Sequence, residues 1–224
     1  MAQVCAGSIP LWRAKAVKAP TWALPATIAP MVMRASQGQP KTLQDWLELP
    51  DDARVELIDG EFVEKAAPTF EHGRAQGHTA GSIVGPFDRR PGGAGGPGGW
   101  WIVTEVDILL DGRIYRPDIA GWRRERASVP FKERPVALRP DWICEIVSDS
   151  NRTTDTVTKL RRYHHAGVPH YWILDQMEST LTVHRHTADG YLVALRAESG
   201  ERVRAEPFEA IELLVSVLLG GDED

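Results

Sequence analysis

Two carboxylates and one lysine have the types and positions needed for metal-dependent phosphoryl chemistry. Asp118 follows a proline in a run flanked by apolar residues, and Glu145 lies in the middle of the apolar run 142–147. A carboxylate buried in such a strand is costly unless a cation or hydrogen bonds compensate for its charge. Lys159 follows on a segment whose apolar residues recur at helical spacing. The three residues together indicate a site that holds a divalent cation beside a phosphate.

Mg²⁺ is the cation that suits these side chains. It takes hard oxygen ligands, usually one or two protein carboxylates, with water and phosphate oxygens completing its shell. Asp118 and Glu145 on neighbouring strands could supply the carboxylates, and the backbone carbonyl of Ile146 a further oxygen. A bound Mg²⁺ lowers the pKa of water and polarises a phosphoryl oxygen. Lys159 would add a compact positive charge beside the attacking water or the phosphate, and Glu56 a further carboxylate.

The elements that must position these residues begin near residue 41. Thr42 and Asp45 resemble a helix capping box, which predicts a short helix through Leu49. Alternating apolar residues around Asp59-Gly60 predict a strand hairpin over 54–64. A longer helix is expected over 71–85, although it contains glycines at every fourth residue. This glycine stripe would let another backbone approach closely; packing on the sheet is the favoured interpretation, and a dimer contact is the alternative.

Asp118 is expected on one of two paired strands. These strands are predicted at 100–110 and 113–122, on either side of the turn Asp111-Gly112. Their pairing would let Asp118 face Glu105 or Asp107 across the hairpin. Residues 123–140 are charged and contain prolines, so an irregular connection is expected there.

Glu145 and Lys159 belong to a predicted strand–helix–strand unit. A buried strand over 141–147 leads into a helix from Asn151 to about Ala166, and a second buried strand follows at 171–174. A right-handed crossover of this length makes the two strands parallel. A closing hairpin over 181–196 and an apolar helix over 211–219 complete the chain. The fold class is therefore an α/β or α+β fold, with a mixed sheet flanked by helices.

The composition limits the kinds of protein that this chain can be. Its 224 residues are 42% hydrophobic, which is enough for one globular core. The net charge of -5 excludes a basic field over the whole chain. Residues 111–165 contain twelve Lys or Arg and eight Asp or Glu, so this stretch carries +4 and the remainder -9. The positive stretch is the one that contains the candidate site.

Residues 1–40 are rich in alanine and proline and are expected to form a disordered extension. Residues 220–224 form an acidic tail, which leaves 41–219 as the folded domain. The only two cysteines, Cys5 and Cys144, give no disulfide framework, which favours a reducing cytoplasm. No apolar run approaches the length of a membrane span.

The order of these motifs resembles the PD-(D/E)XK nuclease superfamily and, more closely, the Uma-two family of restriction endonucleases. The similarity spans about residues 42–215 and depends on the motifs taken together. The matching segments are Val55–Glu61, His72, Arg116-Pro117-Asp118, Glu145–Ser148, and the stretch from Asp155 through Lys159 to Asp175.

The resemblance implies a restriction-endonuclease-like fold and a metal-dependent cut in DNA, with Mg²⁺ or Mn²⁺ as the cofactor. It assigns metal ligation to Asp118 and Glu145, and it places the catalytic lysine at Lys159, since Val147 stands where the superfamily usually has it. His72 matches a family histidine and would orient a water or a phosphate. By analogy, a homodimer is also expected. Two alternatives remain open: a binding module on the same fold that does not cut, and a phosphohydrolase acting on RNA or small phosphoesters.

Overall fold

The computed structural model describes residues 39–127, 131–147 and 152–222. The stretch Gln39–Asp224 forms one compact unit. The predicted disordered extension at 1–40 lies outside the described residues except for 39–40, and the predicted acidic tail at 220–224 is described only at 220–222. Every helix in the described ranges is too short or too polar to span a bilayer.

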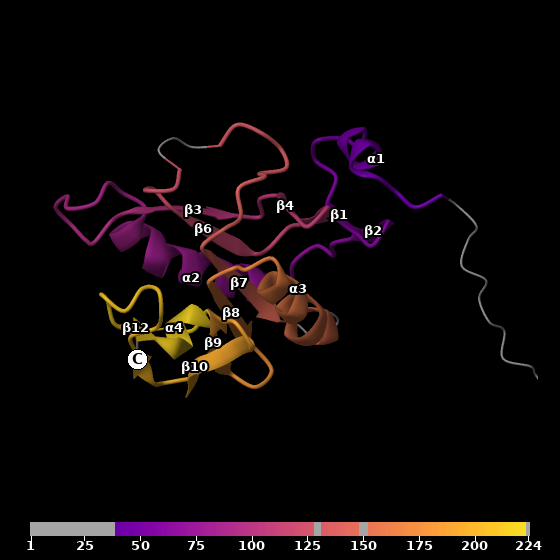
Figure 1. The fold of residues 1–224 in the computed structure, drawn as a ribbon. Helices are drawn as coiled ribbons and strands as arrows, with labels where there is room; N and C mark the ends of the chain where they lie inside the picture. The colour runs from indigo at the N-terminus through magenta and orange to yellow at the C-terminus, as the bar shows by residue number, and fades with distance from the viewer. Residues whose placement is uncertain (1–38, 128–130, 148–151, 223–224) are drawn as a thin grey trace, which may run out of the picture. The chain divides into compact units, whose positions relative to one another are not determined.

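A six-stranded mixed sheet forms the centre of this unit, in the order β10-β9-β8-β7-β6-β3 (Figure 1). β7 and β8 are parallel, as the predicted crossover requires, and the other neighbours are antiparallel. The mixed sheet predicted from the sequence is confirmed. Its strands are β3 (Trp100–Thr104), β6 (Ile119–Arg123), β7 (Trp142–Val147), β8 (His170–Asp175), β9 (Thr180–Thr187) and β10 (Gly190–Glu198).

A smaller antiparallel sheet has the order β2-β1-β5-β4. Both predicted hairpin turns are confirmed: Asp59-Gly60 and Asp111-Gly112 have positive φ angles, which two-residue hairpin loops require. The strands of this sheet are β1 (Val55–Ile58), β2 (Glu61–Glu64), β4 (Ile108–Leu110) and β5 (Arg113–Tyr115).

The two long strands predicted at 100–110 and 113–122 are each divided between the two sheets. β3 ends at Thr104 because Glu105 has a φ of 55°, a left-handed conformation that interrupts a strand. Pro117 lies between β5 and β6 and has no N–H to donate to a ladder. The prediction of two continuous strands was wrong, since the apolar alternation continues through both breaks.

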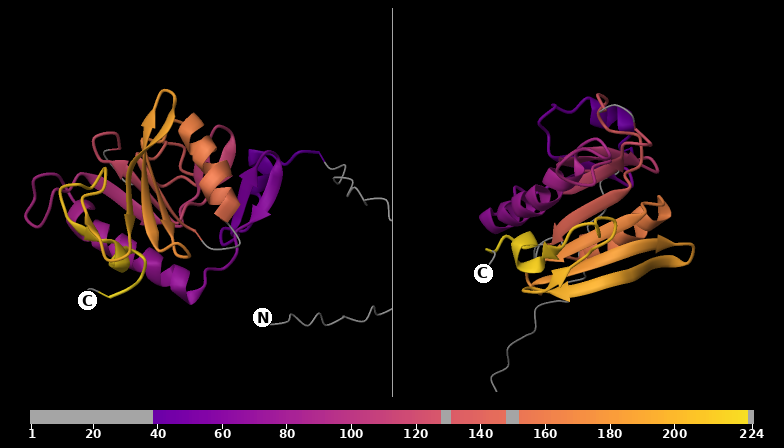
Figure 2. Two further views of the ribbon diagram at one scale, coloured as in Figure 1. Left: turned by 90° about the horizontal axis from the view of Figure 1, so that it is seen from below. Right: turned by 90° about the vertical axis from the view of Figure 1, so that its left-hand side faces the viewer.

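Helices cover both faces of the large sheet (Figure 2). α2 (Phe70–Phe87) packs its Ala75 and Ile83 against Cys144 and Ile146 on one face. On the other face lie η1 (Thr154–Lys159), a π-helical segment, and α3 (Leu160–His165), whose Tyr163 packs against Ile143 and Val147. Successive residues of β7 thus point alternately toward α2 and α3, and the position of Glu145 in this alternation places it on the α3 side.

The glycine stripe of α2 faces away from the sheet. A Cβ atom built at Gly73, Gly77, Gly81 or Gly85 would meet no described atom within 4 Å other than the nearby backbone of its own helix. The interpretation that the stripe packs on the sheet was therefore wrong, and the buried face of α2 consists of other residues. The alternative of a dimer contact stays a prediction.

The remaining helices lie near the ends of the described chain. α1 (Leu43–Leu47) begins with the predicted capping box, in which the Thr42 N–H donates to Asp45 at 2.7 Å. The prediction of a helix over 211–219 was wrong in part. Leu213–Leu214 forms β12, which pairs with β11 (Arg202–Val203), and only α4 (Val215–Leu218) is helical. An apolar run of this length suits either conformation, and the pairing with β11 decides it.

Candidate active site

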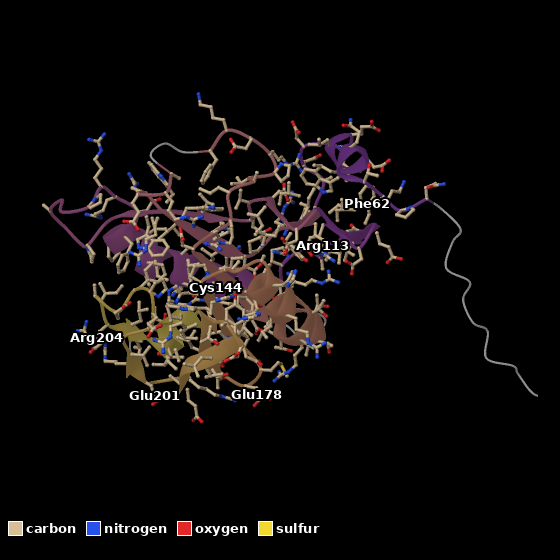
Figure 3. All side chains as sticks on the ribbon, viewed as in Figure 1. Phe62, Arg113, Cys144, Glu178, Glu201 and Arg204 are labelled. Atoms are coloured by element: carbon tan, nitrogen blue, oxygen red, sulfur yellow. The ribbon has the colours of Figure 1, made fainter. Side chains whose placement is uncertain are left out.

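Segments that are far apart in the sequence meet in one pocket of about 150 Å³ beside β6 and β7. All six candidate residues from the sequence contribute to it, and their roles stay predictions. The lining residues include Glu56 (β1), Lys65 (after β2), His72 (α2), Asp118 (before β6), Glu145 and Ile146 (β7), and Asp155 and Lys159 (η1). Figure 3 shows the neighbouring Cys144 in the middle of the densely packed side chains, so the pocket lies next to the core.

The pocket forms where β6 and β7 separate. Their ladder runs from Gly121 opposite Trp142 to Ile119 opposite Cys144 and does not include the next pair. Beyond this point the backbone N–H of Ile146 donates to Oδ2 of Asp118 at 2.7 Å. The aspartate side chain thereby takes the place of a backbone acceptor, and the end of the ladder fixes its orientation.

Asp118 is held by positive and polar groups at its other oxygen. Oδ1 lies 2.8 Å from Nζ of Lys65 and 3.2 Å from Nε2 of His72. Burial acts to raise the pKa of Asp118, but the hydrogen bond from His72 and the charge of Lys65 outweigh it and hold the pKa well below its usual range. Asp118 is therefore an anion at neutral pH, as a metal ligand must be.

Glu145 is in a different electrostatic state. Its Oε1 accepts hydrogen bonds from Tyr163 at 2.8 Å and from Lys159 at 3.0 Å, and its side chain is 2% exposed. Burial raises the pKa of Glu145 to about 8; Lys159 opposes this shift, and Asp155 adds to it. The nearby positive charge of Lys159 therefore only partly compensates for the burial of Glu145.

Lys159 lies between three carboxylates. Its Nζ is 3.0 Å from Glu145, 3.1 Å from Asp155 and 3.6 Å from Glu56. Burial acts to lower the pKa of Lys159, but the charge of Glu145 and the other carboxylates raises it well above its usual value. The ammonium group is therefore charged. The π-helical turn of η1, a distortion often found at functional sites, places both Asp155 and Lys159 on the buried side.

Glu56 and His72 are positioned by the backbone around them. Glu56 is buried, and its Oε1 accepts the backbone N–H of Arg116 at 2.8 Å. His72 is in the first turn of α2, where its backbone N–H donates to the hydroxyl of Thr69. Since its ring contacts Asp118, the structure gives His72 a way to orient this carboxylate.

Of the two partners expected for Asp118, only Glu105 is adjacent. The Glu105 N–H donates to the carbonyl of Asp118 at 3.2 Å. Asp107 instead forms a bidentate pair with Arg116, with distances of 2.7 and 2.8 Å. Sequence reasoning gave no site role to Lys65 or Asp155. Asp155 had a usable signal, since it precedes Lys159 by four residues on a helix, whereas nothing local distinguishes Lys65.

The oxygen donors that line the pocket are of the kind that a divalent cation takes. Five carboxylates and two lysines line it, so its formal charge is -3 (2 - 5) when every carboxylate is ionised. The carboxylates of Asp118 and Glu145 and the carbonyl of Ile146 are all hard oxygen donors, which Mg²⁺ prefers. No group of three or more His, Cys, Asp or Glu side chains in the described ranges is arranged to hold a metal ion. The fit to Mg²⁺ therefore depends on two carboxylates and one carbonyl.

The raised pKa of Glu145 predicts that the metal-free protein becomes less stable as the pH rises. The group has a pKa of about 8 in the folded protein and an ordinary value of 4.5, so between these values the folded state binds more protons than the unfolded state. This stabilisation is complete below pH 4.5 and is lost as the pH rises through 8. The free energy of unfolding should fall by up to about 1.4 kcal/mol per pH unit within the window.

Urea unfolding at pH 5, 6.5 and 8 in the presence of a chelator would measure this effect. In Glu145→Gln the side chain still accepts the Tyr163 hydroxyl but no longer titrates. The difference in stability between the wild type and this variant should therefore change with pH. A difference that stays constant from pH 5 to 8 would contradict the raised pKa.

A mixed sheet with an aspartate, a glutamate and a lysine gathered beside its central strands defines a restriction-endonuclease-like protein. The family model of Uma2, described as "Putative restriction endonuclease", matches residues 41–216, and the chain therefore belongs to the Uma2 family. The family description supports nuclease function in general terms.

A solved structure supports the fold. It is described as a "putative nuclease belonging to DUF820" from Anabaena variabilis, and it aligns with a TM-score of 0.61 and 22% sequence identity. The alignment covers 80% of this chain and 98% of the other. The comparison with curated proteins gave no match. The restriction-endonuclease-like fold expected from the sequence is thus confirmed.

Proposed function

We propose that this chain is a Mg²⁺-dependent endonuclease that hydrolyses phosphodiester bonds in DNA. The observation that carries the proposal is the convergence of Asp118, Glu145 and Lys159, which come from three separate segments, in one pocket. Membership of the Uma2 family supports a nucleic acid as the substrate. Asp118, Glu145 and the carbonyl of Ile146 would hold Mg²⁺ or Mn²⁺. When bound, the cation activates water and stabilises charge on the phosphate.

The side chains of the pocket have separate roles in this proposal. Lys159, held by Glu145 and Asp155, supplies a permanent positive charge to the scissile phosphate. Glu56 is fixed by the Arg116 N–H and is available to accept a hydrogen bond from the attacking water. His72 keeps Asp118 in position.

The basic stretch 111–165 contributes less free positive charge than its composition indicates. Most of its arginines are paired with carboxylates of the same chain, so they neutralise internal charges rather than DNA. These pairs are Arg113–Asp59, Arg116–Asp107, Arg124–Asp88, Arg126–Asp141, Arg134–Asp107, Arg152–Asp175 and Arg162–Asp59. We therefore expect moderate affinity for DNA, with recognition concentrated near the pocket.

Incubation of supercoiled plasmid with the purified protein tests the proposal. We expect nicked or linear product with Mg²⁺ or Mn²⁺ and none after chelation with EDTA. Glu145→Gln should remove the activity, because an amide cannot supply the anionic ligand, whereas Glu133→Gln at an exposed position should leave it unchanged. Equal cleavage by Glu145→Gln would show that another site or a contaminant cuts. Retained DNA binding without any cleavage would favour a binding module on the same fold.

A further inference from the structure

Lys65 is a second lysine in the pocket, and the proposed reaction does not use it. It follows β2 directly, and its side chain is 11% exposed. Its Nζ donates to the carbonyl of Arg116 at 2.7 Å and to Oδ1 of Asp118 at 2.8 Å, and it lies 3.5 Å from Oε1 of Glu105. One carbonyl and two carboxylates thus surround this ammonium group.

These partners are the kind of oxygen donors that a divalent cation takes. Burial acts to lower the pKa of Lys65, but the charges of Asp118 and Glu145 raise it, so the group is a cation in this position. Oδ2 of Asp118 already accepts the N–H of Ile146. Oδ1 is consequently the oxygen best placed for a metal ion, and it is the oxygen that Lys65 contacts.

We propose that Lys65 occupies the cation position at Asp118 in the metal-free protein and competes with the divalent ion for Oδ1. The inference rests on the proposed function, because it requires a divalent cation to bind Asp118. Two positive charges on one carboxylate oxygen repel each other strongly at contact distance, so we expect the ammonium group to leave when the ion binds. The flexible side chain of Lys65 allows this movement. Its neighbours Glu64 and Ala66 also line the pocket.

The competition makes the affinity for metal depend on Lys65. Without the lysine, the ion would bind an anionic oxygen that has lost its closest cationic partner, and the affinity would rise. A lysine that serves only to stabilise the fold would have no such effect on the metal. The two roles therefore differ in a binding measurement that does not require DNA or activity.

Titration with Mn²⁺, followed by the loss of the free-ion electron paramagnetic resonance signal, tests the proposal on the wild type and on Lys65→Met. We expect the variant to bind Mn²⁺ at least about tenfold more tightly, because a charge-assisted hydrogen bond no longer competes. Lys132→Met removes the same charge from an exposed position and should bind as the wild type does. Unchanged or weaker binding by Lys65→Met, with binding by the wild type, would overturn the competition alone. If neither protein binds Mn²⁺, both this inference and the proposed metal site fail.

Thermal unfolding gives a second readout. In EDTA, Lys65→Met should melt below the wild type because the buried Asp118 has lost a cationic partner. Saturating Mn²⁺ should then raise its Tm by more than it raises that of the wild type. A smaller rise would contradict the proposal. If Lys65→Met does not fold without metal, Lys65→Gln, whose amide can still donate to Asp118, serves the same comparison.

Discussion

Replacing Lys159 with methionine should lower the rate of metal-dependent cleavage by about 10²–10³-fold, the effect of removing one fixed electrostatic stabiliser from an active site. The methionine side chain has a similar length and fills a similar volume, but it has no charge. The ammonium group of Lys159 is within 3.6 Å of three carboxylates, so its position does not depend on the substrate. The loss should appear mainly in kcat, because a group fixed in advance stabilises the charge that develops in the transition state.

The same substitution should also affect stability in a pH-dependent way. Glu145 and Asp155 have pKa values raised by burial, so both can take up a proton when the lysine is absent. Lys159→Met should therefore be tolerated at pH 6 and become destabilising above pH 8. Arg161→Met, on the exposed side of the following helix, is the matched control and should change neither property. Cleavage that survives Lys159→Met at the wild-type rate would exclude Lys159 from the reaction.

Replacing Asp118 with asparagine should remove cleavage and weaken metal binding together. The amide has no charge to offer a cation, and it leaves Lys65 without its closest carboxylate. Removing one partner of a buried ion pair costs about 3–5 kcal/mol of stability. The asparagine side chain would still have an oxygen for the N–H of Ile146, which favours a folded but inactive protein.

Three measurements separate these effects of Asp118→Asn. Plasmid cleavage should fall by at least about 10²-fold, Mn²⁺ affinity should fall, and the urea midpoint should decrease. Asp189→Asn lies on the exposed turn between β9 and β10 and provides the control for a changed charge. Wild-type metal affinity in Asp118→Asn would show that the cation binds elsewhere.

Local rules were sufficient for much of the fold. The capping box at Thr42 and the turns at Asp59-Gly60 and Asp111-Gly112 depend on neighbouring residues, and each is present. The parallel pairing of β7 and β8 follows from the handedness of a short crossover. The break at Glu105 could not be predicted in this way. Glu105 is held in a left-handed conformation where its side chain binds Arg54 and its N–H binds Asp118, and both partners are distant in the sequence.

Most residues of the candidate site could be selected from the sequence, but the contacts between them and the contribution of Lys65 could not. Asp118 and Glu145 could be selected because carboxylates in apolar runs require compensation, and Lys159 because it follows them on a predicted helix. Glu56 could equally have been a solvated strand residue; its face is buried because η1 and the segment before β6 cover it. Lys65 could not be selected, since its partner Asp118 is 53 residues away and its neighbour Glu64 is exposed.

The hydrogen bond from Ile146 gives Asp118 a structural role in addition to its proposed role in the pocket. Oδ2 accepts the backbone N–H of Ile146 where the ladder between β6 and β7 ends, and Oδ1 faces the pocket. A protein of this fold that does not cut would still need this acceptor, because losing it would leave a buried N–H unpaired. An aspartate at this position in another sequence therefore marks the architecture, and the accompanying lysine is the better indicator of activity.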